Sequence, residues 1–543
     1  MKNYVAEIIE KALGSLLDVN QMPEIIIENP RMPEHGDAAC NVAMTLARTL
    51  KKPPRAIAEE LVSKLEYDES AIKSVEIAGP GFINFRYADD WLYHQLETIR
   101  SAGSEFGKGE SLKGKKVLVE FVSANPTGPL TVGHGRNAVL GDTISRLLEW
   151  SGAKVDREYY FNNAGRQMRI LGQSVASRYA DLVGGTFPFP EDGYQGEYIK
   201  DIAKDVQTKH GDDLLNSDSE AIFRKAAEEA IFDDIQQTLE RMNIKMDLFF
   251  NEHSLYESGA IEKVVTDLRE KGLVFEKDGA TWFKTTEFGK EKDTVLIKSS
   301  GEPTYRLPDI AYHAEKLNRG YDLCVDVFGA DHIATYPDVI NAIGALGYEK
   351  EKVDVLVYQF VTIVQDGKPF KMSTRKANFI TLDELMDETG ADVTRFFFLM
   401  RAPGTHLEFD IDQAKESGEK NPVFYLQYAH ARIKSISRNL GDTLDANAKA
   451  DFSLLKHSSE VSLIKQLLLF PESIESAAKH KEPHRLINYL NDLAAGFHKF
   501  YHDCRIVGEE ESLALARMQL LECVAQVMAN GLGILGIDAP DRM

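Results

Sequence analysis

Apolar residues in the first third of the chain change from a continuous run to helical spacing over a short distance. Residues 116–122, KVLVEFV, form a nearly continuous apolar run, which is typical of a strand buried on both faces in a parallel sheet. A loop broken by Gly and Pro follows, and apolar residues then recur four apart between 139 and 148, which predicts an amphipathic helix. Strand, loop and helix in this order predict the start of an α/β unit.

The same alternation returns later in the chain. Residues 321–332, YDLCVDVFGADH, predict a strand that ends in a glycine turn, followed by a helix through 339–346 and the apolar run 353–364, VDVLVYQFVTIV. This order predicts a doubly wound fold, whose ligands gather at the carboxyl ends of the strands. A long helical tract at about 162–243 splits the fold, and the strand-like segments ATWFKT and TVLIKS then return the chain toward a sheet.

Both ends of the chain predict further domains, since 543 residues exceed the roughly 250–300 that one core accommodates. Residues 1–107 alternate helical and strand patterns and lead into the Gly- and Lys-rich stretch 103–116, the best candidate for a linker. From about residue 420 the pattern is helical, punctuated by Pro471 and Pro483. We therefore predict a multidomain α/β protein: an N-terminal α+β domain at 1–107, a Rossmann-type domain at 108–415 with the helical insertion, and an all-α bundle at 416–543.

Composition narrows the function classes. The chain has 63 Lys and Arg against 85 Asp and Glu, a formal charge of −22, which argues against nonspecific coating of nucleic acid but leaves a local basic face open. Its four cysteines are far apart without a C-x-x-C pair, so neither a disulfide framework nor a zinc knuckle is indicated. No apolar run reaches the roughly 18 residues of a membrane span, and the first residues do not resemble a signal peptide. We expect a soluble cytoplasmic protein without a membrane partner.

Polar residues gather where the first predicted strand ends. Glu120 and Asn125 lie at its carboxyl edge, and Gly133 and His134 lie at the start of the helix that follows. The first turn of a helix presents unpaired backbone N–H groups and a positive dipole end, so an anion such as phosphate could dock there. This indicates a nucleotide site. Taken alone, Glu120 is equally well explained as a solvated residue at a strand end.

Two further stretches carry candidate ligands. Tyr305 and Asp309 are four residues apart and share one face if the segment is helical, although an ordinary amphipathic turn has the same pattern. Gly329 ends a strand, and Asp331 and His332 follow at its carboxyl end. A carboxylate there suits ribose hydroxyls, whereas the alternative is a simple helix N-cap by Asp331.

A basic loop follows the second sheet segment, in the sequence VQDGKPFKMSTRKANFI. Cations and hydroxyls on one loop are what a polyphosphate leaving group requires. A run of charges is more often a solvated face, so the loop is informative only together with the other segments. Its candidates are Lys368, Lys371, Ser373, Thr374, Arg375 and Lys376.

Taken together, these segments resemble a known family. VGH after the first strand and KMSTR about 240 residues later resemble the two signatures of class I aminoacyl-tRNA synthetases, His-Ile-Gly-His and Lys-Met-Ser-Lys-Ser. VEFVSANPTGPLTVGHGR, TYRLPDIAYH, KMSTRKANFITLDEL, VFYLQYAHARI and LGIDAPDRM look like the arginyl-tRNA synthetase family, as do PEHGDAACNVAM and GPGFINFR near the N-terminus. The resemblance covers essentially the whole chain and implies a class I synthetase core as the catalytic domain.

The resemblance implies roles for the candidate residues. Those implied to bind arginine are Glu120, Ser123, Asn125, Tyr305 and Asp309. Those implied to bind ATP are Thr131, Gly133, His134, Gly329, Asp331, His332, Lys371, Met372 and Thr374, and the implied catalytic residues are His134, Lys371, Ser373 and Arg375. ATP is expected to enter with Mg²⁺ rather than with a metal held by the protein.

The C-terminal bundle is implied to bind the tRNA anticodon and the N-terminal domain to touch the tRNA elbow. Basic and aromatic side chains together can hold phosphates and stack unpaired bases. The alternative is that the aromatics form the bundle core, which we favour for Phe424. The candidates are Tyr425, Tyr428, Arg432 and Arg438. The expected partners are tRNA, L-arginine and ATP, with the chain acting as a monomer, and arginine activation is implied to need bound tRNA.

Two signature positions differ from the pattern. Thr131 replaces the usual first His, and Thr374 replaces the second Lys of the other signature, without a compensating Lys before the first. Two other functions therefore remain open: a nucleotidyltransferase of the same fold that needs no tRNA, and a synthetase-like RNA-binding protein that has lost catalysis. The C-terminal bundle argues against the first alternative, and the intact candidate residues argue against the second.

Overall fold

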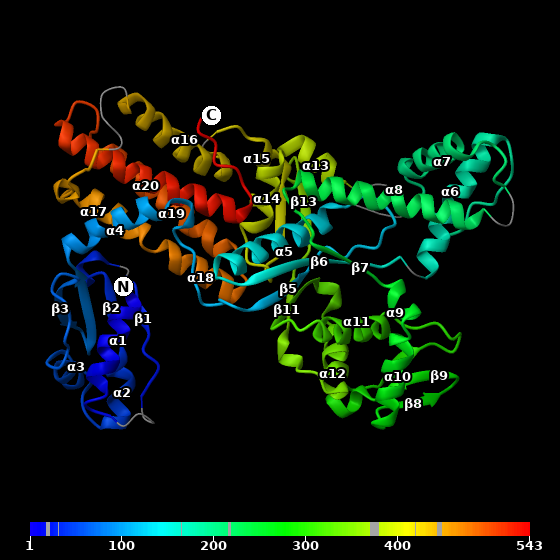
Figure 1. The fold of residues 1–543 in the computed structure, drawn as a ribbon, viewed down its shortest axis with the longest axis horizontal. Helices are drawn as coiled ribbons and strands as arrows, with labels where there is room; N and C mark the ends of the chain where they lie inside the picture. Colours follow the sequence, from blue (N-terminus) through cyan, green and yellow to red (C-terminus); the bar gives the residue numbers. More distant parts are fainter. Residues whose placement is uncertain are drawn as a thin grey trace.

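The computed structural model describes residues 1–17, 22–30, 32–163, 165–215, 219–369, 380–418, 420–441 and 448–543. The molecule is elongated (Figure 1), with the N-terminal unit at one end, a central sheet, and a helical insertion at the other end. The predicted multidomain α/β architecture is confirmed.

The central sheet has five parallel strands in the order β12-β11-β5-β6-β7. From β5, the next two strands in the chain, β6 and β7, lie on one side, and the later strands β11 and β12 lie on the other. The direction in which strands are added therefore reverses between β5 and β11. Ligands bind at such a switch point, beyond the carboxyl ends of the strands. The strands are β5 (Lys116–Glu120), β6 (Lys154–Phe161), β7 (Leu248–Asn251), β11 (Leu323–Gly329) and β12 (Val353–Tyr358).

Helices pack against this sheet and lead into or out of the switch point. The predicted first helix is α5, which follows β5 directly and is buried along most of its length. Helix α11 leads into β11, and α12 connects β11 to β12. These helices are α5 (Val132–Trp150), α11 (Arg306–Asn318) and α12 (Tyr336–Leu346).

The helical insertion projects from the sheet as three packed helices, at the right of Figure 1. They are α6 (Arg166–Val183), α7 (Glu197–His210) and α8 (Glu220–Arg241). The two strand-like segments that follow do not join the parallel sheet. They are β9 (Ala280–Phe283) and β10 (Thr294–Ile297), and they form a separate antiparallel sheet with β8 (Val274–Lys277) in the order β10-β9-β8. Helices α9 (His253–Glu257) and α10 (Ala260–Glu270) precede this sheet in the chain.

The apolar run 353–364 is two strands rather than one. The chain leaves the parallel sheet at Gln359, whose backbone N–H donates to the Pro403 carbonyl (3.0 Å). The second half is β13, in the sheet β14-β13-β15. Elements of this region are β13 (Val361–Gln365), β14 (Lys368–Pro369), β15 (Leu407–Asp410), α13 (Leu382–Thr389), α14 (Ala391–Leu399) and α15 (Ile411–Lys415).

The N-terminal unit has its own hydrophobic core, formed by residues between Val5 and Phe85. Helix α4 (Asp89–Ala102) packs instead with the C-terminal helices, because Leu92, Leu96 and Ile99 belong to the main core. The unit comprises α1 (Lys2–Leu13), α2 (Val42–Leu50), α3 (Pro54–Val62), β1 (Ile27–Glu28), β2 (Ala38–Cys40), β3 (Ile72–Ala78) and β4 (Phe82–Tyr87). A cleft of about 970 Å³ separates it from the bundle and is bridged by the ion pairs Lys2–Glu472 and Lys465–Asp37.

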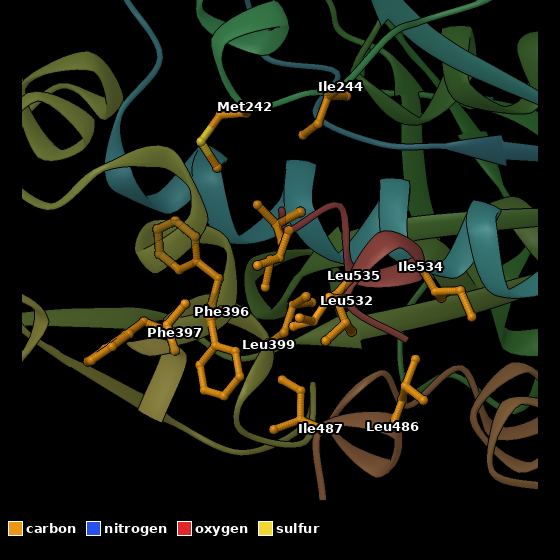
Figure 2. Packing of buried hydrophobic residues seen from close by; sticks show 14 of the residues in the cluster. Met242, Ile244, Phe396, Phe397, Leu399, Leu486, Ile487, Leu532, Ile534 and Leu535 are labelled. Carbon is orange, nitrogen blue, oxygen red and sulfur yellow. The ribbon is translucent and has the colours of Figure 1, made fainter. Parts of the chain in front are cut away.

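The C-terminal bundle consists of α16 (Pro422–Gly441), α17 (Ser458–Leu467), α18 (Phe470–His480), α19 (His484–Asp503) and α20 (Glu511–Leu535). Among the described residues, α20 is the one helix long and apolar enough to cross a membrane. However, 78% of the apolar 18-residue stretch of this helix is buried, as expected of the core helix of a bundle. Figure 2 shows the end of α20 packing against α14 and α19 near Met242, so the bundle and the region of the parallel sheet share one core.

A buried ion pair fastens this junction. The Arg395 guanidinium, on α14, donates to the Asp142 carboxylate on α5 (2.6 Å). It also donates to the backbone carbonyls of Leu535 (2.9 Å) and Met242 (2.7 Å), which end α20 and α8. One side chain therefore ties α5 to both the bundle and the insertion.

Candidate active site

The backbone turns sharply where β5 ends. Val122 and Ser123 have positive φ angles of 66° and 41°, a conformation that costs a β-branched residue such as valine free energy. The turn is held by Asn137 of α5, whose Oδ1 accepts the Val122 N–H (2.6 Å) while its Nδ2 donates to the Val327 carbonyl on β11 (2.8 Å). Asn137 thus joins the two strands that flank the switch point.

Glu120 is the last residue of β5 and is buried, with 4% of its surface exposed. The Ser123 hydroxyl donates to its Oε1 (2.9 Å), and the Lys316 ammonium donates to its Oε2. Burial raises the pKa of Glu120, which the nearby Lys316 counteracts. The reading of Glu120 as a solvated strand-end residue is therefore wrong.

Two more carboxyl groups lie in this region, the half-buried Asp309 and the buried Glu252. Asp309 lies in the first turn of α11, and Glu252 follows β7, where the Tyr160 hydroxyl donates to it (2.7 Å). Burial is the largest cause of a raised pKa in both, and the charges of Glu120 and Glu252 help to raise the pKa of Asp309 to about 7. No hydrogen bond among the described residues reaches the Asp309 carboxyl group. It is an acid without a partner in a cluster of acids, which suits a cationic ligand.

The start of α5 is a capping box. Nδ1 of His134 accepts the Thr131 backbone N–H (3.1 Å), so the neutral ring carries its proton on Nε2 and can donate from there. Burial lowers the pKa of His134 to about 4. A Cβ at Gly133 would meet only the Thr131 hydroxyl, at 3.8 Å, among the described residues, so open space lies above this turn.

Asn125 and Tyr305 lie toward the solvent side of the cluster. The Asn125 side-chain amide donates to Gln167 of α6 (2.9 Å), so the loop is braced by the insertion. Tyr305 immediately precedes α11, one turn before Asp309, and is 69% exposed. The predicted helical face is present, but Tyr305 does not pack closely on the acids.

The carboxyl end of β11 holds the other candidates. Gly329 ends the strand, and the exposed residues Asp331 and His332 follow in a short 3₁₀ turn. The His332 ring stacks on Phe328 at a centroid distance of 4.9 Å. A narrow cavity joins His332 to Asp309, so the β11 end and the acidic cluster belong to one site.

The candidates of the second signature, Lys371, Met372, Ser373, Thr374 and Arg375, lie outside the described residues. The chain that follows them is described. Thr381 forms an antiparallel bridge with Thr131, and the Leu382 N–H donates to the Leu130 carbonyl (2.8 Å). The second signature therefore leads directly to the start of α5.

The bundle candidates separate into two groups. Tyr425 is partly buried against the main core and its ring lies 5.1 Å from that of His498, and Arg438 donates to the Asp541 carbonyl (3.0 Å). Phe424 is also partly buried against the core, as favoured from the sequence. Tyr428 is 39% exposed, and the Arg432 guanidinium lies over its ring (5.8 Å) and over that of Tyr501 (4.4 Å).

Several residues of the site were missed in the sequence. Asp326 interrupts the apolar run of β11, and a charge inside a buried strand needs a partner. His313 and Lys316 lie four and seven residues after Asp309, on the same helical face. These two signals together would have indicated a buried ion pair. Glu252 and Asn137 had no comparable signal, because their roles depend on distant segments.

Comparisons with known proteins agree with this geometry. The family described as "tRNA synthetases class I (R), catalytic domain" matches residues 96–397. The "Arginyl tRNA synthetase N terminal domain" matches residues 2–87, and the "DALR anticodon binding domain" matches 426–543. A doubly wound sheet with the ligand candidates at its switch point, together with these matches, defines a class I aminoacyl-tRNA synthetase.

Individual relatives narrow the assignment. The chain is 53% identical to an arginine–tRNA ligase of Salinibacter ruber over 100% of both chains. It is 50% identical to one of Desulfotalea psychrophila, over 95% of this chain and 94% of that one. The arginyl-tRNA synthetase structure of Thermus thermophilus shares the fold, with a TM-score of 0.79 and 23% identity over 100% of both chains. The chain belongs to the arginyl-tRNA synthetase family.

Proposed function

We propose that this arginine–tRNA ligase performs both steps of its reaction at the switch point between β5 and β11. An oxygen of the arginine carboxylate attacks the α-phosphate of ATP, forming arginyl-adenylate and releasing pyrophosphate. The 2′-hydroxyl of the terminal tRNA ribose then attacks the carbonyl carbon and AMP leaves. The observation that carries this proposal is the group of acids at the end of β5, next to the loop that leads into the start of α5, because arginine and phosphate need opposite charges close together.

Asp309 is proposed to receive the guanidinium group of arginine, with Glu120 beside it. A guanidinium is permanently charged and presents donors in a fork, so ionised carboxylates are suitable partners. Ser123 orients Glu120, Asn125 contacts the reacting end of arginine, and Tyr305 closes over the side chain. Positioning and electrostatics account for most of the acceleration, because little covalent chemistry falls to the protein.

ATP is proposed to lie over Gly133, where the open space admits the adenine, with His134 and the start of α5 directed at the phosphates. Gly329, Asp331 and His332 approach the ribose and adenine. Among the described residues, no group of three or more His, Cys, Asp or Glu side chains could hold a metal. Mg²⁺ prefers phosphate oxygens and water, so we propose that it enters with ATP. We also propose a cytoplasmic location and a monomeric chain.

We expect the His134 ring to stay neutral and to titrate near pH 4, because burial disfavours the imidazolium. Its Nε2–H then donates to a phosphate oxygen without a change of charge. NMR titration of isotope-labelled histidine, with His134→Asn to assign the signal, measures this. A signal that is lost in the variant and titrates near the usual value of about 6.5 would contradict it.

The Tyr428–Arg432–Tyr501 cluster is proposed to contact tRNA. We expect Arg432→Ala to raise the KM for tRNA about three- to tenfold and to reduce the slope of log KM against log salt by roughly 0.7, since one phosphate contact is lost. Arg432→Lys keeps the charge but not the planar stacking and should be intermediate. An unchanged tRNA KM in Arg432→Ala would exclude the cluster, and an equal change in arginine KM would indicate a general defect.

Arginine-dependent charging of bulk tRNA tests the function directly. Radiolabelled arginine should become acid-precipitable only with ATP and tRNA present. Pyrophosphate release without charging would favour a nucleotidyltransferase that needs no tRNA. Absence of both activities in folded protein would favour an RNA-binding protein without catalysis.

A further inference from the structure

Lys316 is a fully buried lysine at the end of α11. Its ammonium group contacts two carboxylates, Glu120 of β5 and Asp326 of β11, the latter at 2.6 Å. Glu120 and Asp326 are neighbours in the register of the parallel sheet, so one ammonium spans both strands at the switch point. It also lies 4.3 Å from the centre of the Tyr312 ring, which leaves it no contact with water.

The contacts continue from Lys316 to Asp309. The other oxygen of Asp326 is 2.9 Å from Nε2 of His313, and Nδ1 of His313 is 2.7 Å from the backbone carbonyl of Asp309. Lys316, Asp326 and His313 therefore form a continuous polar chain that ends at the first turn of α11. Lys316 therefore contacts Glu120 directly, and it is linked to the backbone of Asp309 through Asp326 and His313.

Removal of this charge would leave Glu120 and Asp326 as adjacent buried carboxylates without a cation between them. Like charges at that distance cannot both persist in a buried site, so one of the two acids would retain a proton. A protonated Glu120 would offer arginine no charge and would lose the orientation that Lys316 and Ser123 give it.

We propose that Lys316 is a positioning residue for arginine: it keeps Glu120 ionised and fixed toward the pocket, and it braces the turn that carries Asp309. Lys316 does not touch the substrate in this scheme. The inference rests on the proposed arginine pocket and adds to it a determinant of arginine affinity.

The test compares Lys316→Met with Arg319→Met in the full-length protein, assayed with tRNA, ATP and arginine. Arg319 immediately follows α11 and pairs with the buried Glu158, so its loss disturbs the same helix end without removing a contact of Glu120. We expect Lys316→Met to raise the arginine KM at least about tenfold with the ATP KM unchanged. Arg319→Met should lower thermal stability with little change in arginine KM. Lys316→Arg, which restores a cation, should recover part of the affinity.

A pH profile separates positioning from a structural role. In Lys316→Met the acidic limb of kcat/KM for arginine should move to higher pH, because Glu120 or Asp326 keeps its proton longer. A structural defect would lower the profile without moving it. The ionisable groups packed around Glu120 are Asp309, Tyr312, His313 and Lys316 on α11, Asp326 on β11, and Glu158 and Tyr160 on β6, with Glu252 behind Tyr160.

Four outcomes decide the inference and the pocket on which it rests. A folded Lys316→Met enzyme with wild-type arginine KM would overturn the inference. An Asp309→Asn variant whose kcat/KM for arginine stays at the wild-type value would instead refute the arginine pocket itself. Equal changes in Lys316→Met and Arg319→Met would also overturn it. If Lys316→Met does not fold, Asp326→Asn replaces it. That variant leaves Lys316 paired with Glu120 but removes the carboxylate that links Lys316 to His313, so an unchanged arginine KM would refute the bracing of the Asp309 turn by Lys316.

Discussion

Asp309→Asn is expected to lower kcat/KM for arginine at least about a hundredfold while the KM for ATP stays almost constant. The reason is that Asp309 is a half-buried acid without a hydrogen-bond partner among the described residues, and loss of one member of a charge pair that the bound substrate buries costs on the order of 3–5 kcal/mol. Steady-state charging assays with arginine and ATP varied separately measure this. Glu120→Gln should have a smaller effect, because Lys316 already meets part of the Glu120 charge.

The same residue predicts the pH dependence. The pKa of Asp309 is raised to about 7, so below that pH the free enzyme holds a neutral acid, which cannot pair with a guanidinium. We expect kcat/KM for arginine to fall about tenfold per pH unit below about 7, and kcat to fall only at lower pH, since bound arginine stabilises the carboxylate. Asp309→Asn should lack this limb. A limb that persists in the variant would show that another group carries the titration.

The sequence predicted the architecture well because its signals are local. Continuous apolar runs predicted the buried strands of the parallel sheet, and the four-residue spacing after 138 predicted α5. The prediction was less complete where pairing between distant segments decides which sheet a strand joins. ATWFKT reads as a strand in any sheet, and only its pairing with β8 and β10 places it outside the parallel one.

The candidate active site was also predicted only as far as local patterns allow. Local patterns offered Glu120 and Asp309 as separate candidates, and only the family resemblance implied that both bind arginine. The fold brings them together because β5 and α11 meet at the switch point. The polar chain from Lys316 to His313 was not predicted, because it joins residues of β5, β11 and α11 whose pairing no local pattern reveals. The roles of the individual residues remain predictions, since the comparisons identify the family and not its contacts in this chain.

The second prediction concerns the loop of the second signature. Thr374 replaces a lysine there, yet pyrophosphate gains charge as it leaves and needs a nearby cation. We propose that Lys371 and Arg375 share that role. Lys371 opens the signature, and Arg375 follows the substituted position with a forked group suited to phosphate oxygens. The chain after this loop returns to the start of α5, through the bridge between Thr381 and Thr131, where the phosphates are proposed to lie.

Alanine at Lys371 or at Arg375 should lower the rate of adenylate formation by roughly tenfold, about 1.4 kcal/mol each, and the double variant by about a hundredfold, with little change in arginine KM. Thr374→Lys should be neutral or mildly activating, because it adds a cation without removing one. Lys368→Ala, on the exposed strand β14 before the signature, is the matched control and should keep its rate. Pre-steady-state measurement with tRNA bound reports the step directly. Unchanged rates in both single variants would place the cation outside this loop.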